Sequence, residues 1–235
     1  MKTWILRHIK EESSRLRSNN MRMIDISTPL QEGVPVWPKS PGITVTWMKR
    51  VERGDGANLT RLDTDVHVGT HAEGKIHNFT EGETIDEISL DVFIGPAFVA
   101  DLGSSDSITE SALAAAHIPQ GTTRLLLKTK NSGFWKIPQH TFREDFAGLT
   151  PDGARWVVEH GVKLVANDYL SIAHYGDGRE VHDILLKGGV TIIEGVDLSN
   201  ASQGEYQLIC LPLKLIGREA APARAILLED PESRI

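Results

Sequence analysis

From Met23 onward the chain alternates short β-type runs with short helical stretches, and this alternation limits the folds open to it. Residues typical of strands fill 23–26, 44–48, 59–68, 97–102, 124–129, 164–167, 190–193, 206–211 and 223–228. Helices are predicted at 109–116, 150–160 and 181–187, where threonine caps, a proline after the second cap and trailing glycines supply start and stop signals. Strand–helix–strand units of this kind predict one α/β domain over 21–235, with a β-rich core covered by a few short helices.

Residues 1–20 form a charged segment ahead of this domain. Trp4, Ile5, Ile9 and Leu16 stand loosely at helical spacing, and Asn19-Asn20 ends the pattern. The segment is interpreted as an added N-terminal arm. Two alternatives are open, a frayed tail and a helix that packs on another subunit.

Charge and hydropathy exclude several classes of function. The formal net charge is −7 and no cluster of Lys and Arg occurs, which argues against a nucleic-acid partner. No run approaches the roughly 18 apolar residues of a membrane span, and no signal peptide is recognisable, so a cytoplasmic protein is expected. The single cysteine, Cys210, lies in an apolar run and is expected to be buried.

The segment 65–77 concentrates three of the nine histidines together with a carboxylate and a lysine. In an extended chain, side chains at alternating positions share a face; these would be His67, His71, Glu73, Lys75 and His77. A straight strand would nevertheless hold His67 and His71 roughly 13 Å apart, too far for one ion. The backbone must therefore bend, and Gly69 and Gly74 provide the freedom to do so. A helix would bring the two histidines together at i and i+4, but the two glycines argue against it.

Imidazoles combined with a carboxylate are typical ligands of Zn²⁺, Mn²⁺ or Fe²⁺. Because no cysteine joins this group, a catalytic centre with an open position for water is predicted rather than a structural zinc site. Metal-bound water loses a proton near neutral pH, so hydrolysis is the expected chemistry. No G-x-S-x-G elbow, phosphate-binding loop or dinucleotide fingerprint competes with this interpretation.

The sequence HVGTHAEGKIH over 67–77 resembles the H-x-G-T-H-x-D-x-P-x-H signature of the cyclase family, which includes bacterial kynurenine formamidases and isatin hydrolases. Further segments follow in the family's order: IDISTPL at 24–30, VWP at 36–38, NDYLS at 167–171, HDILL at 182–186, IEG at 193–195 and LPLKLIG at 211–217. The resemblance covers about residues 23–229. It implies the family's swivelling β/β/α fold and assembly into a homodimer or homotetramer.

Carried over position by position, the resemblance implies site roles. His67, His71 and Glu73 correspond to metal ligands, and His77 to a ligand or an acid/base group. His182 and Glu194 correspond to the family's distal histidine and glutamate, which help to bind metal and move protons. Taken alone, these last two residues would be interpreted as solvated surface residues.

Two departures distinguish this chain from the family signature, since Glu73 replaces aspartate and Lys75 replaces proline. If Lys75 points inward it takes the place of a second cation, so one Zn²⁺ or Mn²⁺ ion per subunit is expected; if Gly74 turns it outward, it has no such role. Trp37 and Phe79 are candidates to line an apolar pocket for an aromatic substrate, and plain core positions are the alternative.

The leading functional hypothesis is hydrolysis of a small carboxamide, formamide, lactam or ester. In it His77 or His182 carries the proton to the leaving group, and Glu194 orients the ligands. The alternatives are a metal-dependent lyase, dehydratase or ring-forming enzyme, and a relative that binds metal or ligand without hydrolysis. The fold alone does not separate them.

Overall fold

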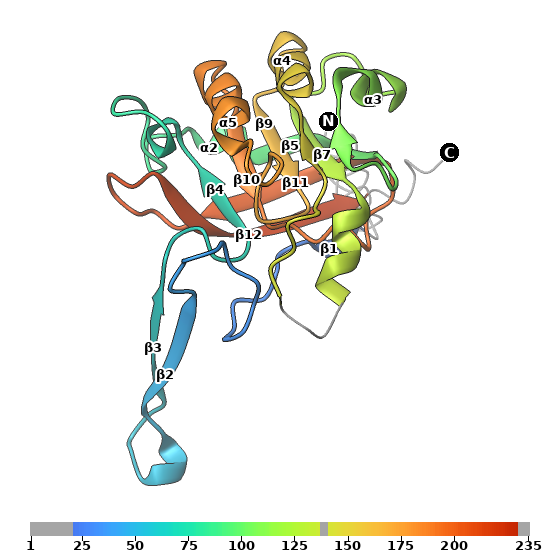
Figure 1. Ribbon diagram of the computed structural model, residues 1–235. Coiled ribbons are helices and arrows are strands. Elements are labelled where there is room, and N and C mark those ends of the chain that lie inside the picture. The colour runs from blue at the N-terminus through green and yellow to red at the C-terminus, as the bar shows by residue number, and fades with distance from the viewer. Residues whose placement is uncertain (1–20, 137–140, 230–235) are drawn as a thin grey trace, which may run out of the picture.

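In the computed structural model, which describes residues 21–136 and 141–229, a seven-strand ring forms the centre of the molecule (Figure 1). In order around the ring, the strands are β12 (Ala220–Glu229), β11 (Gly204–Pro212), β5 (Ile94–Asp101), β7 (Arg124–Lys128), β9 (Leu164–Asn167), β10 (Thr191–Glu194) and β4 (His71–Glu73). β4 pairs back onto the first residues of β12 and closes the sheet. β1 (Arg22–Asp25) pairs with the other end of β12, where it lies outside the ring.

The three longest α-helices lie in the connections between the parallel strands of this sheet. β5, β7, β9 and β10 run parallel to one another, so each connection between them must cross back over the sheet. Three helices lie in these connections and together cover one side of the sheet (Figure 1): α3 (Glu110–Ala115), α4 (Pro151–Glu159) and α5 (Gly178–Lys187). The predicted caps are confirmed, because the Thr109 and Thr150 hydroxyls accept hydrogen bonds from the amides of Ala112 and Gly153.

Strand alternation divides the apolar residues of the sheet into two cores, and a third, smaller cluster contains Phe146, Tyr169 and Leu170. On β7, Leu126 faces the interior of the ring, whereas Leu125 and Leu127 face the helices. All three leucines are fully buried, because β7 is covered on both faces. The strand therefore has a continuous apolar run in the sequence rather than an alternating one. The predicted α/β domain with a β-rich core and short covering helices is confirmed.

The remaining elements of the described chain are short, apart from one hairpin. They are η1 (Val51–Arg53), η2 (Lys75–His77), α2 (Leu90–Phe93), β6 (Ser107–Ile108), η3 (Lys130–Lys136) and β8 (Gly148–Leu149). β2 (Ile43–Lys49) and β3 (Leu59–Thr64) form an antiparallel hairpin that projects from the body (Figure 1). Among residues 21–136 and 141–229, no helix is long and apolar enough to cross a membrane. The predicted arm at 1–20 lies outside the described residues.

Candidate metal centre

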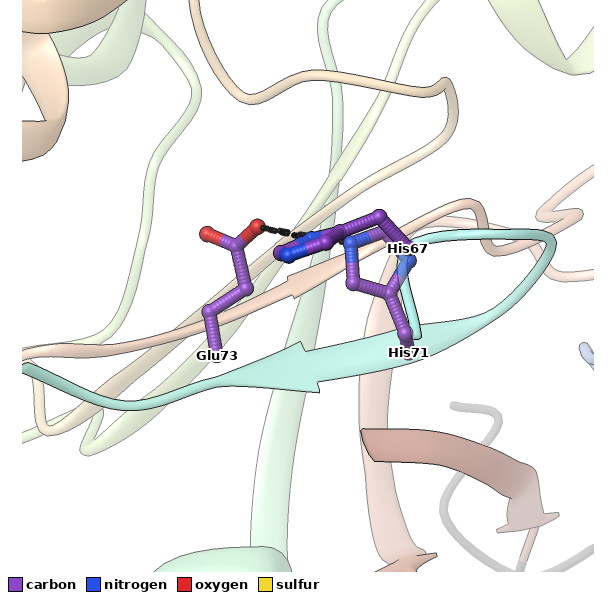
Figure 2. Close-up of side chains that lie close together, drawn as sticks. All are labelled: His67, His71 and Glu73. Atoms are coloured by element: carbon purple, nitrogen blue, oxygen red, sulfur yellow. Dashed lines mark ion pairs between the residues drawn. The ribbon is translucent and has the colours of Figure 1, made fainter. Parts of the chain in front are cut away.

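The predicted bend between His67 and His71 is present. The strand predicted over 59–68 ends at Thr64, and a turn with Gly69 at φ +69° leads into β4, which begins at His71. Because the chain reverses here, the two imidazole centroids lie 4.9 Å apart rather than at the separation of a straight strand. Figure 2 shows both rings beside the Glu73 carboxylate, which projects from the same strand as His71.

A close backbone crossing holds this turn against the end of β10. A Cβ atom on Gly195 would lie 2.4 Å from the Gly69 carbonyl oxygen. Only glycine therefore permits these two backbone segments to approach this closely. The Thr70 hydroxyl donates a hydrogen bond to the Gly195 carbonyl at 2.6 Å. His71 is paired with Glu194 across the β4–β10 ladder, and the crossing therefore places the two side chains together.

The Glu73 carboxylate is the centre of the cluster. Its Oε1 lies 3.0 Å from His67 Nδ1, 3.4 Å from His71 Nε2 and 3.8 Å from His77 Nε2. The first and last of these histidines are half-buried, whereas Glu73 and His71 are almost fully removed from solvent. The extra methylene of Glu73, compared with the aspartate of the family signature, still leaves the carboxylate among the imidazoles.

His182 and Glu194 join the cluster from the other side. His182 lies on α5, where its Nδ1 contacts the Gly178 carbonyl oxygen at 2.7 Å and leaves Nε2 facing the site. That Nε2 lies 3.3 Å from Glu194 Oε1 and 3.6 Å from Glu73 Oε2. The Ile172 amide donates to Glu194 Oε1 at 2.6 Å, which fixes the orientation of this carboxylate at the end of β10.

The donor set fits a divalent metal ion. His67, His71 and Glu73 form one group and Glu73, His77 and His182 another, each with candidate donor atoms within 4.8 Å of one another. An ion with bonds of about 2.1 Å to four donors needs them about 3.4 Å apart, which the separations around Glu73 Oε1 approach. His71 Nε2 and Glu73 Oε2 are buried without a hydrogen-bond partner among the described residues, as atoms reserved for an ion would be. The carbonyl of Gly69 contacts His71 Nδ1 at 2.9 Å and thereby presents Nε2 to the site.

Charge coupling within the cluster shifts several pKa values. For His182, burial favours the neutral ring, but hydrogen bonding to Glu194 and the charges of Glu73 and Glu194 outweigh it and raise the pKa to about 9. For Glu73, burial acts against ionisation, yet His67, His71 and the other two rings hold the pKa well below its usual value. Burial lowers the pKa of His77, so His77 and His182 are not equivalent proton carriers.

A cavity of about 540 Å³ opens onto these side chains. Trp37 lies in its wall, 39% exposed, and packs its ring against Phe142 and Tyr175. Its predicted position beside the site is therefore observed, while its contact with a substrate stays a prediction.

Lys75 and Phe79 do not reach the site as their leading predictions required; the structure shows the alternatives, an outward lysine and a core phenylalanine. Alternation of faces holds only along a strand, and β4 ends at Glu73; Lys75 is the first residue of η2, exposed, with its aliphatic part packed on Gly82. Phe79 packs against the helix-side core and under the Lys187 ammonium, 5.3 Å from the ring centroid. Neither lines the cavity, so Lys75 does not take the place of a second cation there.

Two carboxylates near the centre were not predicted from the sequence. Asp65 accepts a hydrogen bond from the His67 amide at 2.9 Å, and its position two residues before the first histidine is a local signal for this contact. Glu219 Oε1 lies 3.6 Å from His67 Nε2. No local pattern identifies Glu219, because it approaches only through the pairing of β12 with β4.

The closed sheet with its covering helices defines an α/β protein, and its histidine–carboxylate cluster is typical of a metal-binding site. Comparison with known proteins identifies the family. The family model described as "Putative cyclase" matches residues 24–174. The chain belongs to this cyclase family.

Curated relatives match over most of their length. Cyclase-like protein 1 from Arabidopsis thaliana is 34% identical over 217 residues, which cover 88% of this chain and 85% of that protein. The kynurenine formamidase of Salinibacter ruber is 33% identical over 219 residues, covering 90% of this chain and 100% of that protein. A solved structure titled as a potential metal-dependent hydrolase with cyclase activity is 33% identical, with a TM-score of 0.76 over 90% of this chain and 100% of that chain.

Proposed function

We propose that this protein is a metal-dependent hydrolase of a small amide that is not a peptide bond, such as a formamide or lactam, or of a related ester. The observation that carries the proposal is the convergence of His67, His71 and Glu73, two of which keep a buried polar atom without a partner among the described residues. Support also comes from relatives named kynurenine formamidase and metal-dependent hydrolase.

The donor chemistry favours Zn²⁺ or Mn²⁺ as the ion. When bound, such an ion would polarise the scissile carbonyl and lower the pKa of water. Two donor groups share Glu73, one with His67 and His71, the other with His77 and His182. Since the groups overlap, the site can be built for one ion or for two, and metal titration decides between them.

The protein's own groups provide orientation and proton transfer. The carbonyl of Gly178 fixes the His182 ring, so that Nε2 faces Glu73 and Glu194. A proton held at this nitrogen is positioned for delivery to a leaving amine in the cavity. The amide of Ile172 orients Glu194, which in turn orients both His182 and His71.

Hydrolysis is tested with formanilide, a simple aryl formamide, in water enriched in heavy oxygen. We expect one solvent oxygen to appear in the released formate and turnover to stop after chelation and return with Zn²⁺ or Mn²⁺. Turnover without solvent oxygen in any product would instead identify a lyase or dehydratase. The matched control is His160→Ala, since His160 is exposed and stacks on Trp156.

We also propose self-association through the β2–β3 hairpin, as the expected homodimer or homotetramer requires. Opposite residues in an antiparallel pair share a face, so Val45, Trp47 and Leu62 lie together, and they are 39%, 46% and 52% exposed. An isolated two-stranded hairpin is marginally stable in water and needs a covered face. The cross-strand pairs Val45–Leu62 and Trp47–Thr60 on this face are uncharged, although the Arg50 guanidinium lies over the Trp47 ring. A second copy can therefore meet the face around Val45 and Leu62 without like-charge repulsion. The cytoplasmic location remains a prediction.

A further inference from the structure

Besides the histidines, the wall of the cavity contains one lysine, Lys39, and one arginine, Arg179. Arg179 is already engaged, because its guanidinium lies 3.1 Å from Asp183 Oδ1 and donates to the Asn78 carbonyl. Lys39 has no ion pair within the described part of the chain. We infer that Lys39 selects substrates with an anionic group, above all a carboxylate, on the part that does not react. The inference rests on the proposed hydrolysis and names its substrate class.

The backbone of Lys39 supports a role for the side chain. Its φ is +76°, in the left-handed region that residues with a Cβ atom disfavour. Three residues later the same loop adopts φ +73°, and there the sequence has glycine, Gly42. A lysine in a conformation suited to glycine is an unfavourable choice for the turn itself, which supports a role for its ammonium group.

The turn that carries Lys39 is tied to the metal-binding segment. The Ser40 amide donates to the Trp37 carbonyl at 2.9 Å and closes the turn. The Ser40 hydroxyl donates to Asp65, whose other oxygen accepts from the His67 amide. Asp65 therefore fixes the turn relative to the first histidine, so that Lys39 is held at a set position beside the site.

The neighbouring wall indicates what accompanies the anionic group. Trp37, Pro38 and Leu170 give the cavity an apolar side. The ring of Trp37 is braced by Phe142 and Tyr175, with centroid distances of 5.2 and 5.5 Å. A flat apolar group can lie on this side while a carboxylate meets Lys39, which describes an aromatic amide with an acidic substituent.

The test compares formanilide with its ring-carboxylated counterpart in the full-length metal-loaded protein. We expect the wild type to prefer the carboxylated substrate in kcat/KM and Lys39→Gly to reduce this preference about tenfold, the size expected for one hydrogen bond to a charged group. Lys39→Glu should reduce it further. Glycine suits φ +76°, so Lys39→Gly should melt no lower than the wild type, and a folding defect does not obscure the result. Lys163→Gln is the control. This exposed lysine lies at the start of β9, whereas the cavity residues Leu170 and Ser171 lie beyond the other end of that strand.

The outcomes separate this inference from the proposed function. If all four proteins hydrolyse both substrates with the same preference, the role of Lys39 is wrong and hydrolysis stands. If the wild type hydrolyses neither substrate while metal is bound, the proposed function fails and the inference fails with it. A preference that weakens as ionic strength rises in the wild type, but not in Lys39→Gly, would further support the charge interaction.

Discussion

The hairpin β2–β3 and the metal-binding segment 67–77 are neighbours in the sequence but are built in opposite ways. In the segment, polar side chains are buried: His71 is fully buried and Glu73 is 1% exposed. In the hairpin, apolar side chains are exposed, including Trp47 and Leu62. Buried polar groups and exposed apolar faces are the two informative departures from ordinary burial. The first supports the proposed metal ion, and the second supports the proposed self-association.

Removal of a metal ligand should have the largest effect. We expect His67→Ala or His71→Ala to lose the ion and to reduce kcat/KM by about a thousandfold or more, since a bound Lewis acid supplies several kcal/mol of transition-state stabilisation. The fold should remain, because the two apolar cores do not include these residues. Metal analysis and circular dichroism check both points, with His160→Ala as control. Full metal occupancy in either variant would refute the ligand assignment.

The crossing of Gly69 and Gly195 should be the next most sensitive feature. Gly195→Ala places a Cβ atom 2.4 Å from a carbonyl oxygen, so the turn that carries His67 and His71 must shift. Gly161→Ala is a matched control. Gly161 has nearly the same φ as Gly195, +74° against +72°, but a Cβ atom there would meet no other atom within 4 Å. The control should lose about 1 kcal/mol in the free energy of unfolding, and Gly195→Ala several times more, with weaker metal binding.

Denaturant unfolding and metal titration of both variants measure this difference. Equal losses of stability, with metal affinity unchanged in Gly195→Ala, would show that the crossing does not position the site.

A charge on the apolar face of the hairpin should change assembly without changing the site. We expect Leu62→Asp to weaken self-association about thirtyfold or more, as for a central interface residue, while metal content stays the same. Thr46→Asp is the control, because Thr46 lies on the opposite, polar face and is paired with Arg61. Analytical ultracentrifugation over a concentration series gives the result. A wild type that is monomeric at all concentrations would show that the exposed face has another purpose.

The smallest effect concerns pH and is expected in protein stripped of metal. The pKa of His182 is raised from 6.5 to about 9, so its protonated form stabilises the fold fully below pH 6.5 and this contribution disappears as the pH rises to about 9. His67, whose pKa is also raised, acts in the same direction. Calorimetry should show Tm falling by a few degrees over this range, and by less in His182→Gln. An identical fall in the variant would exclude His182 as its source.

The sequence predicted the sheet well where strands are buried on both faces. The strand over 164–167 was predicted at its observed bounds, because its apolar run is broken on either side by charged residues. β4, with three residues, is too short to recognise as a strand, although it closes the ring and carries His71 and Glu73.

The site was predictable only where its residues are close in the chain. His67, His71, Glu73 and His77 form a local pattern, whereas His182 and Glu194 were recognised through resemblance alone. Glu194 reaches the site by pairing with His71 across β10 and β4, and Glu219 by the pairing of β12 with β4, which are long-range registers that no local pattern encodes. Lys75 was misplaced because an alternation that belongs to strands was extended past the end of β4.

The central claim is that segment 67–77 meets His182 and Glu194 to bind a catalytic metal. Anomalous X-ray diffraction at the zinc and manganese absorption edges, on crystals of protein purified without chelators, tests it most directly. We expect a peak at bonding distance, about 2 to 2.3 Å, from Glu73 and at least two of the four imidazoles. Crystals from protein supplied with either metal that show no peak in this cluster, or a peak only elsewhere on the surface, would contradict it.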